Sequence, residues 1–339
     1  MKKNIYIAVF IAILYLFSNS ANSQVIQFSQ YYSSPTILGP SFAGLHYETK
    51  AVMNYRNQWP GVSNSFVTSA FTVDHFFENR NSGVGVSVLR DEAGAGNLSL
   101  TDFGVSYSYN LKATRNISVR PGIGFKYSKR GIDFYELTFA DQLKNIDNPA
   151  VTTIETPPEE GIGYFDAVAS FLVFSKNYWG GVTVDHLFKP NQTFFGEEAK
   201  IDMLIQAYGG YKIYLKDPRH GSKRKNESLT FSFLYKMQGK FKQLDLGAYW
   251  QKNDLLTGLW YRGIPVLNNP EQGYRNNDAV ILMLGYNFYS LTLQYSYDIT
   301  VNSLMKSSAG SHEVALIYNF KLGKRSKFKK YTPIPCPGF

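Results

Sequence analysis

LTLQYSYDIT, residues 291–300, alternates apolar and polar side chains from the first residue to the last. Successive side chains of a β-strand point to opposite faces, so this run predicts a strand that separates two environments. One face carries Leu291, Leu293, Tyr295, Tyr297 and Ile299, and the other carries Thr292, Gln294, Ser296, Asp298 and Thr300. A series of such runs would form a sheet with one apolar and one polar side.

The alternation recurs along most of the chain. Fourteen runs show it: 47–59, 64–77, 81–91, 97–111, 115–128, 161–175, 178–188, 201–215, 227–238, 241–252, 254–262, 276–288, 290–299 and 309–320. An even number of strands, most of them reaching the roughly 9–11 residues that cross a bilayer, is typical of a transmembrane antiparallel β-barrel. The longer connections mostly follow odd-numbered runs, which predicts periplasmic N- and C-termini. The sequence therefore predicts an all-β membrane barrel, with a soluble sandwich or propeller as the alternative.

The composition excludes several other classes of protein. Of the 339 residues, 44% are hydrophobic and 16% are aromatic, which excludes a disordered chain. A single cysteine, Cys336, excludes an intrachain disulfide scaffold. We find no catalytic, cofactor-binding or metal-binding pattern, because the two Asp-His pairs, Asp74-His75 and Asp185-His186, each join residues that would point to opposite faces of a strand.

The chain divides into four parts by composition. Residues 1–23 have a basic start, an apolar run and small residues before Gln24, which is the pattern of a cleaved secretory signal. Residues 24–46 would form a periplasmic segment or a plug, residues 47–320 the barrel, and residues 321–339 a basic periplasmic tail. This organisation predicts a multi-pass barrel in the bacterial outer membrane, in contact with lipid.

The two faces of the predicted barrel differ in character. Aromatic residues near the strand ends would form girdles at the membrane surfaces, namely Trp59, Phe77, Trp179, Trp250, Trp260, Tyr286, Phe288, Tyr318 and Phe320. The lumen face carries both signs of charge, including Arg56, Arg120, Lys126, Asp166, Asp185, Lys236, Asp245 and Asp298. Two interpretations stay open: a selective pore, or a narrow interior filled by ion pairs. Mixed charge argues against a strongly ion-selective channel.

Charge is also segregated between the predicted ends of the barrel. The connection 132–160 is acidic and would face outward, with Asp133, Glu136, Asp141, Glu159 and Glu160 among its carboxylates. The basic residues would face the periplasm and dock a partner there: Lys223, Arg224, Lys225, Lys324, Arg325, Lys327, Lys329 and Lys330. A nucleic-acid partner is not expected for an exported chain. The alternatives for the basic residues are contact with anionic lipid headgroups and a solvated rim.

The run Tyr55-Arg56-Asn57-Gln58-Trp59-Pro60-Gly61 is long and rare in composition. It resembles the most recognisable motif of the PorP/SprF-like proteins, which belong to the type IX secretion and gliding machinery of Bacteroidetes. The resemblance extends to residues 27–31, 40–44, 91–94 and 184–191, and so covers nearly the whole mature chain.

The resemblance implies a non-enzymatic barrel without a cofactor. Its partners would be periplasmic, peptidoglycan-anchoring components of the secretion machinery. Its client would be a large surface adhesin bearing a C-terminal secretion domain, which the barrel would help to export or attach to the cell surface. This client would meet the outward-facing residues Asp133, Glu136, Asp141, Glu159 and Glu160. A passive porin or small-solute transporter is the alternative function.

Overall fold

The computed structural model describes most of the chain beyond residue 25. The described residues are 26–46, 48–62, 65–94, 96–139, 141–144, 153–155, 161–194, 198–216, 227–263, 278–301 and 308–320. Among them, no helix has the length and apolarity needed to cross a bilayer. The predicted signal at 1–23 and the basic tail at 321–339 lie outside the described residues.

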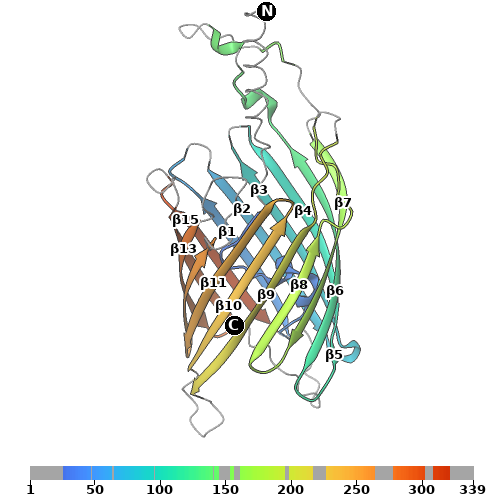
Figure 1. The fold of residues 1–339 in the computed structure, drawn as a ribbon, viewed down its shortest axis with the longest axis vertical. Coiled ribbons are helices and arrows are strands. Elements are labelled where there is room, and N and C mark those ends of the chain that lie inside the picture. The colour runs from blue at the N-terminus through green and yellow to red at the C-terminus, as the bar shows by residue number, and fades with distance from the viewer. Residues whose placement is uncertain are drawn as a thin grey trace, which may run out of the picture.

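The described strands form one antiparallel sheet that closes on itself (Figure 1). They are β1 Thr49–Gln58, β2 Phe66–Phe77, β3 Ser82–Ala93, β4 Leu98–Tyr109, β5 Leu111–Lys112, β6 Ser118–Gly131, β7 Gly161–Phe174, β8 Tyr178–Asp185, β9 Leu204–Lys216, β10 Glu227–Gln238, β11 Phe241–Lys252, β12 Leu255–Arg262, β13 Ala279–Phe288, β14 Leu291–Thr300 and β15 Ser311–Phe320. Consecutive strands pair with one another, except that β4 and β5 both pair with β6, and β1 pairs with β15. Because β5 is a two-residue continuation of β4, the wall is a closed barrel of fourteen strands, which confirms the predicted fold.

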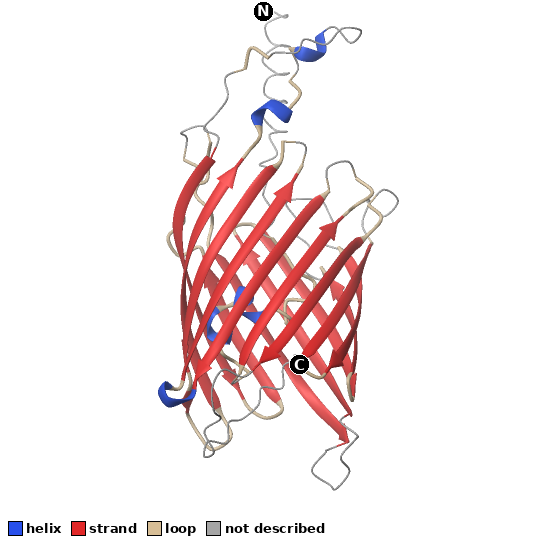
Figure 2. Cartoon of the chain, turned by 180° about the vertical axis from the view of Figure 1, so that it is seen from behind, coloured by secondary structure: helices blue, strands red, loops and turns tan. Residues whose placement is uncertain are grey.

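Helical structure among the described residues is short. It comprises α2 Pro35–Leu38, η1 Pro40–Phe42, η2 Glu78–Arg80, η3 Phe134–Glu136 and η4 Gln142–Lys144. Of these, α2 and η1 lie inside the barrel, as both views show (Figures 1 and 2). They belong to the segment that precedes the first strand.

The two ends of the barrel have different connections. Thr49 of β1 pairs with Phe320 of β15, so the wall begins and ends at the same end, where connections such as 253–254 and 289–290 are short. We call this the short-turn end. The opposite, long-loop end carries the connections 132–160 and 186–203. Which end faces the periplasm stays a prediction.

The predicted alternation of faces is seen along the strands. In β14, Gln294 is 1% exposed and points into the barrel, whereas Tyr295 is 42% exposed and points outward. The prediction is wrong for two of the girdle residues. Trp179 and Trp260 are 3% and 2% exposed and point into the barrel. Their parity explains the error, since Trp260 lies two residues before the inward Arg262 and therefore shares its face.

Candidate functional site

Residues 26–46, which we call the lumen segment, lie inside the barrel (Figure 2). The segment contacts strands around most of the circumference, through Asn54 of β1, Asp74 of β2, Ser108 of β4, Arg120 of β6, Ser170 of β7, Tyr208 of β9, Tyr249 of β11, Trp260 of β12, Met283 of β13, Asp298 of β14 and Glu313 of β15. A segment that touches opposite sides of a closed wall spans its lumen. The lumen, where these contacts are made, is therefore the candidate functional site.

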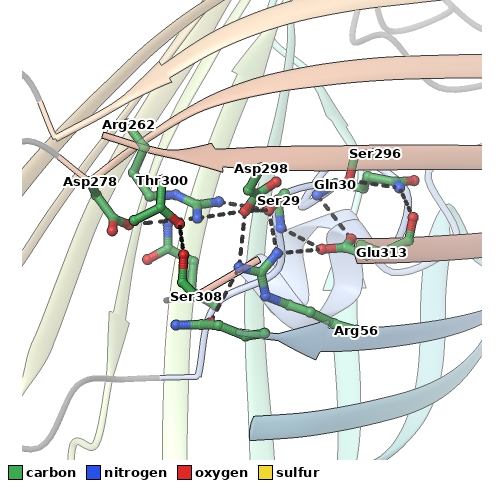
Figure 3. A network of polar contacts seen from close by, with 12 residues as sticks. Ser29, Gln30, Arg56, Arg262, Asp278, Ser296, Asp298, Thr300, Ser308 and Glu313 are labelled. Carbon is green, nitrogen blue, oxygen red and sulfur yellow. Dashed lines mark hydrogen bonds and ion pairs between the residues drawn. The ribbon is translucent and has the colours of Figure 1, made fainter. Parts of the chain in front are cut away.

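Two arginines of the wall meet one carboxylate near the start of the lumen segment (Figure 3). Arg56 Nη2 and Arg262 Nη1 lie 3.0 and 2.9 Å from Asp298 Oδ2, and the three side chains are at most 4% exposed. Removing one member of a buried ion pair leaves an uncompensated charge, which is strongly unfavourable. These three residues therefore link β1, β12 and β14 across the inner surface of the barrel.

The lumen segment completes this cluster. Ser29 Oγ donates to Asp298 Oδ2 at 2.6 Å and accepts from Arg56 Nη1 at 2.5 Å. The backbone N–H groups of Ser29 and Gln30 donate to the Glu313 carboxylate at 2.7 and 3.0 Å. The carboxylates of the wall thus take hydrogen bonds from the segment as well as from arginine. We call Ser29, Arg56, Arg262, Asp298 and Glu313 the anchor network.

An aromatic core holds the rest of the lumen segment. Phe42 packs on Trp179 and Tyr208, with ring centroids 6.4 and 5.3 Å apart, and Tyr31 meets Trp260 edge to face at 5.4 Å. All of these rings belong to one buried cluster. Burial of large aromatic side chains is a strong stabilising contribution, so this core holds the segment to the wall independently of the anchor network.

The backbone of the lumen segment also approaches the wall closely. A Cβ atom at Gly83 would collide with the backbone of Ala43, and one at Gly122 would collide with Ser41. Glycine is needed at both positions because nothing larger leaves room for the segment. Arg120, fully buried, donates to the Ala43 carbonyl oxygen and to Ser108 Oγ, the latter at 2.6 Å.

The predicted family motif, residues 55–61, has one deeply buried side chain. That side chain is Arg56 of the anchor network, whereas Tyr55 is 47% exposed on the outer surface. Trp59 leaves the strand with φ +59°, and its N–H donates to the Gly310 carbonyl oxygen at 3.0 Å. In this chain the motif therefore binds the lumen segment at one residue and forms a turn at the long-loop end.

Three of the predicted client-facing residues, Asp133, Glu136 and Asp141, lie in the connection 132–160 at the long-loop end and accept hydrogen bonds there. Asp133 accepts a hydrogen bond from the Tyr135 backbone at 3.2 Å, and Glu136 accepts one from Asn97 at 3.1 Å. Asp141 accepts hydrogen bonds from the backbone N–H of Ile154 and the hydroxyl of Thr153, which hold the pKa of its carboxyl below the usual value. Two further predicted residues, Glu159 and Glu160, lie outside the described residues, so the client contact stays a prediction.

The predicted periplasmic docking residues are not among those that the structure describes. Lys223, Arg224 and Lys225 lie in 217–226, and Lys324, Arg325, Lys327, Lys329 and Lys330 lie in 321–339. Their role stays a prediction.

A further charged cluster, of Asp166, Asp185 and His186, forms where β8 ends. β8 ends at Asp185, and His186, with φ +57°, directs its Nδ1 to within 2.6 Å of Asp166 Oδ2. Ligand atoms of Asp166, Asp185 and His186 lie within 4.8 Å of one another. The Lys126 ammonium group lies 2.7 Å from Asp185 Oδ2 and already balances part of this charge, so we assign no metal to the group.

Comparisons with known proteins identify relatives of the chain. The sequence profile of the family described as type IX secretion system membrane protein PorP/SprF matches residues 20–318. No curated protein sequence matches the chain. Among solved structures, the outer membrane protein Omp33 of Acinetobacter baumannii is 9% identical with a TM-score of 0.43, covering 82% of this chain and 100% of that one. The toluene transporter TodX of Pseudomonas putida is 8% identical with a TM-score of 0.44, covering 88% and 94%.

Proposed function

Because this chain belongs to the PorP/SprF family of type IX secretion system membrane proteins, we propose that it supports export or surface attachment of a large adhesin-like client at the outer membrane. In this proposal, periplasmic anchoring components dock on the basic residues, and the client meets the long-loop end. The barrel acts by binding partners and has no catalytic role.

The observation that carries the proposal is the lumen segment. A porin needs a continuous water-filled path, whose inner wall is polar. Here residues 26–46 cross the lumen and are held to the wall by a buried aromatic core and a buried ion-pair network. This arrangement supports a barrel that binds partners at its two ends and on its outer surface. It disfavours the passive porin, which is the alternative function that the sequence left open.

Two measurements test the proposal. Deleting the gene should reduce one large surface protein about tenfold in peptides shaved from intact cells, and a plasmid copy should restore it. Gentle purification of the barrel from native outer membrane should recover periplasmic components of the secretion machinery. The purified barrel should give no steady open current in planar bilayers. An unchanged surface proteome together with a steady open pore would favour the porin instead.

A further inference from the structure

Strand β7 is much longer than β8, the strand that follows it in the sheet. β7 has 14 residues and β8 has 8. On one side β6 pairs with β7 over its full length, from Phe174 to Gly161, but on the other side β8 reaches only as far as Ala169. Among the described residues, no strand pairs with 161–168 on that side. Figure 1 shows the upper part of β7 rising past the ends of β8 and β9.

At this edge, the backbone N–H and C=O groups of alternate residues point away from β6, in the plane of the sheet. The Ala167 carbonyl oxygen accepts a hydrogen bond from the Leu187 N–H at 3.1 Å, which places the Ala167 backbone groups on the side opposite β6. Alternate residues of a strand direct their backbone groups to the same side, so those of Gly161, Gly163 and Phe165 point there too. A row of such donors and acceptors is a template for another strand.

The outer face beside this edge is apolar. Phe165 is 70% exposed, against 50% for Phe171, which lies on the same face where β8 is present. The ring of Tyr127 lies 5.0 Å from that of Phe165, centroid to centroid. Phe188, whose backbone N–H donates to Asp166 at 3.3 Å, is 60% exposed. An incoming strand would find aromatic rings beside backbone groups that no described strand pairs on that side.

The residues next to the rings favour a particular partner. Gly161 and Gly163 have no side chains, and the side chain of Lys129 on β6 lies beside Gly161, within 3.5 Å of where a Cβ would be. The Lys129 side chain is exposed. Two copies of this chain pairing at their β7 edges would bring two Lys129 ammonium groups to one short interface, whereas a partner strand with a carboxylate would balance the charge.

A second overhanging edge does not share these features. β11 extends past β12 from Phe241 to Asp245, but its outward Leu244 is only partly exposed. The carboxylate of Asp245 also accepts the backbone N–H of Gly263 at 3.1 Å. The edge of β7 is therefore the better candidate for an interaction surface.

We propose that residues 161–165 of β7 form an edge that takes up one extended strand of the exported client by antiparallel or parallel β-augmentation. The strand carries apolar side chains against Phe165 and Tyr127 and a carboxylate toward Lys129. This inference rests on the proposed function, because it names the contact by which the barrel holds its client.

A proline and alanine pair at one position tests the inference. Gly163→Pro removes the N–H that points to the free edge and spares the bonds to β6. Gly163→Ala adds the same Cβ beside the Tyr127 hydroxyl and keeps that N–H, so it is the matched control. Both variants carry the photocrosslinker p-benzoylphenylalanine in place of Phe165 and are expressed in cells from which the native gene has been deleted. The mobility of each unheated variant on detergent gels shows whether it is folded.

The expected result is a cross-link from position 165 to one segment of an exported surface protein, mapped by mass spectrometry. Its yield should fall about tenfold in Gly163→Pro and stay within about twofold in Gly163→Ala, since tenfold, about 1.4 kcal/mol, is the scale of one lost edge hydrogen bond. Cross-links only to this chain's own residues, such as 145–152, only to a second copy, or only to lipid would overturn the inference. So would equal yields from the two variants.

The two proposals fail in different ways. If deleting the gene removes the surface client but Gly163→Pro restores it as well as the wild type does, the edge is not the contact and the proposed function stands. If deleting the gene leaves the surface proteome unchanged, the proposed function fails first.

Discussion

The Arg56 guanidinium group holds the lumen segment to the wall, because it contacts Ser29 as well as the Asp298 and Glu313 carboxylates. Its partners could not be predicted, because Ser29, Asp298 and Glu313 come from three distant parts of the chain. A single sequence gives the face on which a strand residue lies, but not the register between remote strands. The role of Arg56 in binding the lumen segment is therefore a result of the structure alone.

The substitution Arg56→Gln should destabilise the barrel by about 3–5 kcal/mol, because it leaves the Asp298 and Glu313 carboxylates buried with one guanidinium fewer. The midpoint of urea unfolding in detergent, followed by the mobility of the unheated barrel on gels, measures the change. Restoring one balanced pair with Arg56→Gln and Glu313→Gln together should recover part of it.

A matched surface substitution provides the control. Arg90 forms an ion pair with Glu92 at 2.6 Å, but the two side chains are 57% and 46% exposed. Arg90→Gln should therefore cost about 0–1 kcal/mol, since exposed ion pairs contribute little. Equal losses in Arg56→Gln and Arg90→Gln would contradict the anchor network.

At the scale of elements, each of the fourteen alternating runs coincides with a strand, and the boundaries differ by a few residues. The run predicted at 178–188 ends early because His186 takes a left-handed conformation, which stops the strand at Asp185. The strands were predictable because the lumen and the exterior impose a period of two. Residues 26–46 have no such period, so the sequence left two alternatives for them, and the contacts that hold them inside the barrel are visible only in the structure.

A designed disulfide tests the position of the lumen segment in the membrane. Ser34 Oγ hydrogen-bonds Asn54 Oδ1 on β1, so cysteines at these two positions should form a disulfide on mild oxidation, in a background with Cys336→Ser. The bond should appear in most molecules, as a mass decrease of two hydrogens and a peptide joining the two sites.

The control moves the second cysteine by one residue. Met53 is 56% exposed on the outer surface, so Ser34→Cys with Met53→Cys should remain reduced under the same oxidation. If both pairs oxidise equally, or neither does, the lumen segment does not hold its place against β1.

At the scale of the whole molecule, the closed fold and the family were both predictable, and the family profile and the sheet pairing confirm them. The long, rare motif at 55–61 made the family recognisable. The contents of the lumen were less predictable, since Trp179 and Trp260 were expected at the membrane surfaces and instead form part of the inner aromatic core. Large aromatic residues suit both places, so only the parity of each strand distinguishes them.

The wall of the barrel closes before the basic tail begins, so the tail can be removed without breaking a strand pairing. β1 pairs with β15 along ten consecutive residues each, ending at Thr49 with Phe320, so the last residue of the wall is already paired before the tail begins. Truncation after Phe320 should therefore leave a folded barrel with an unchanged unfolding midpoint. The same truncation should abolish recovery of the periplasmic partner, because it removes the basic residues of 321–339.

The electrostatic origin of this loss can be separated from loss of chain length. Replacing Lys324, Arg325, Lys327, Lys329 and Lys330 by glutamine keeps the tail but removes its charge, and should reduce partner recovery nearly as far as truncation does. Recovery by the native tail should fall when salt is raised from about 0.05 to 0.5 M, since the Debye length shrinks from roughly 14 to 4 Å. Full recovery with the truncated chain would move the docking surface from the tail to the barrel rim, where the basic residues of 217–226 connect β9 and β10.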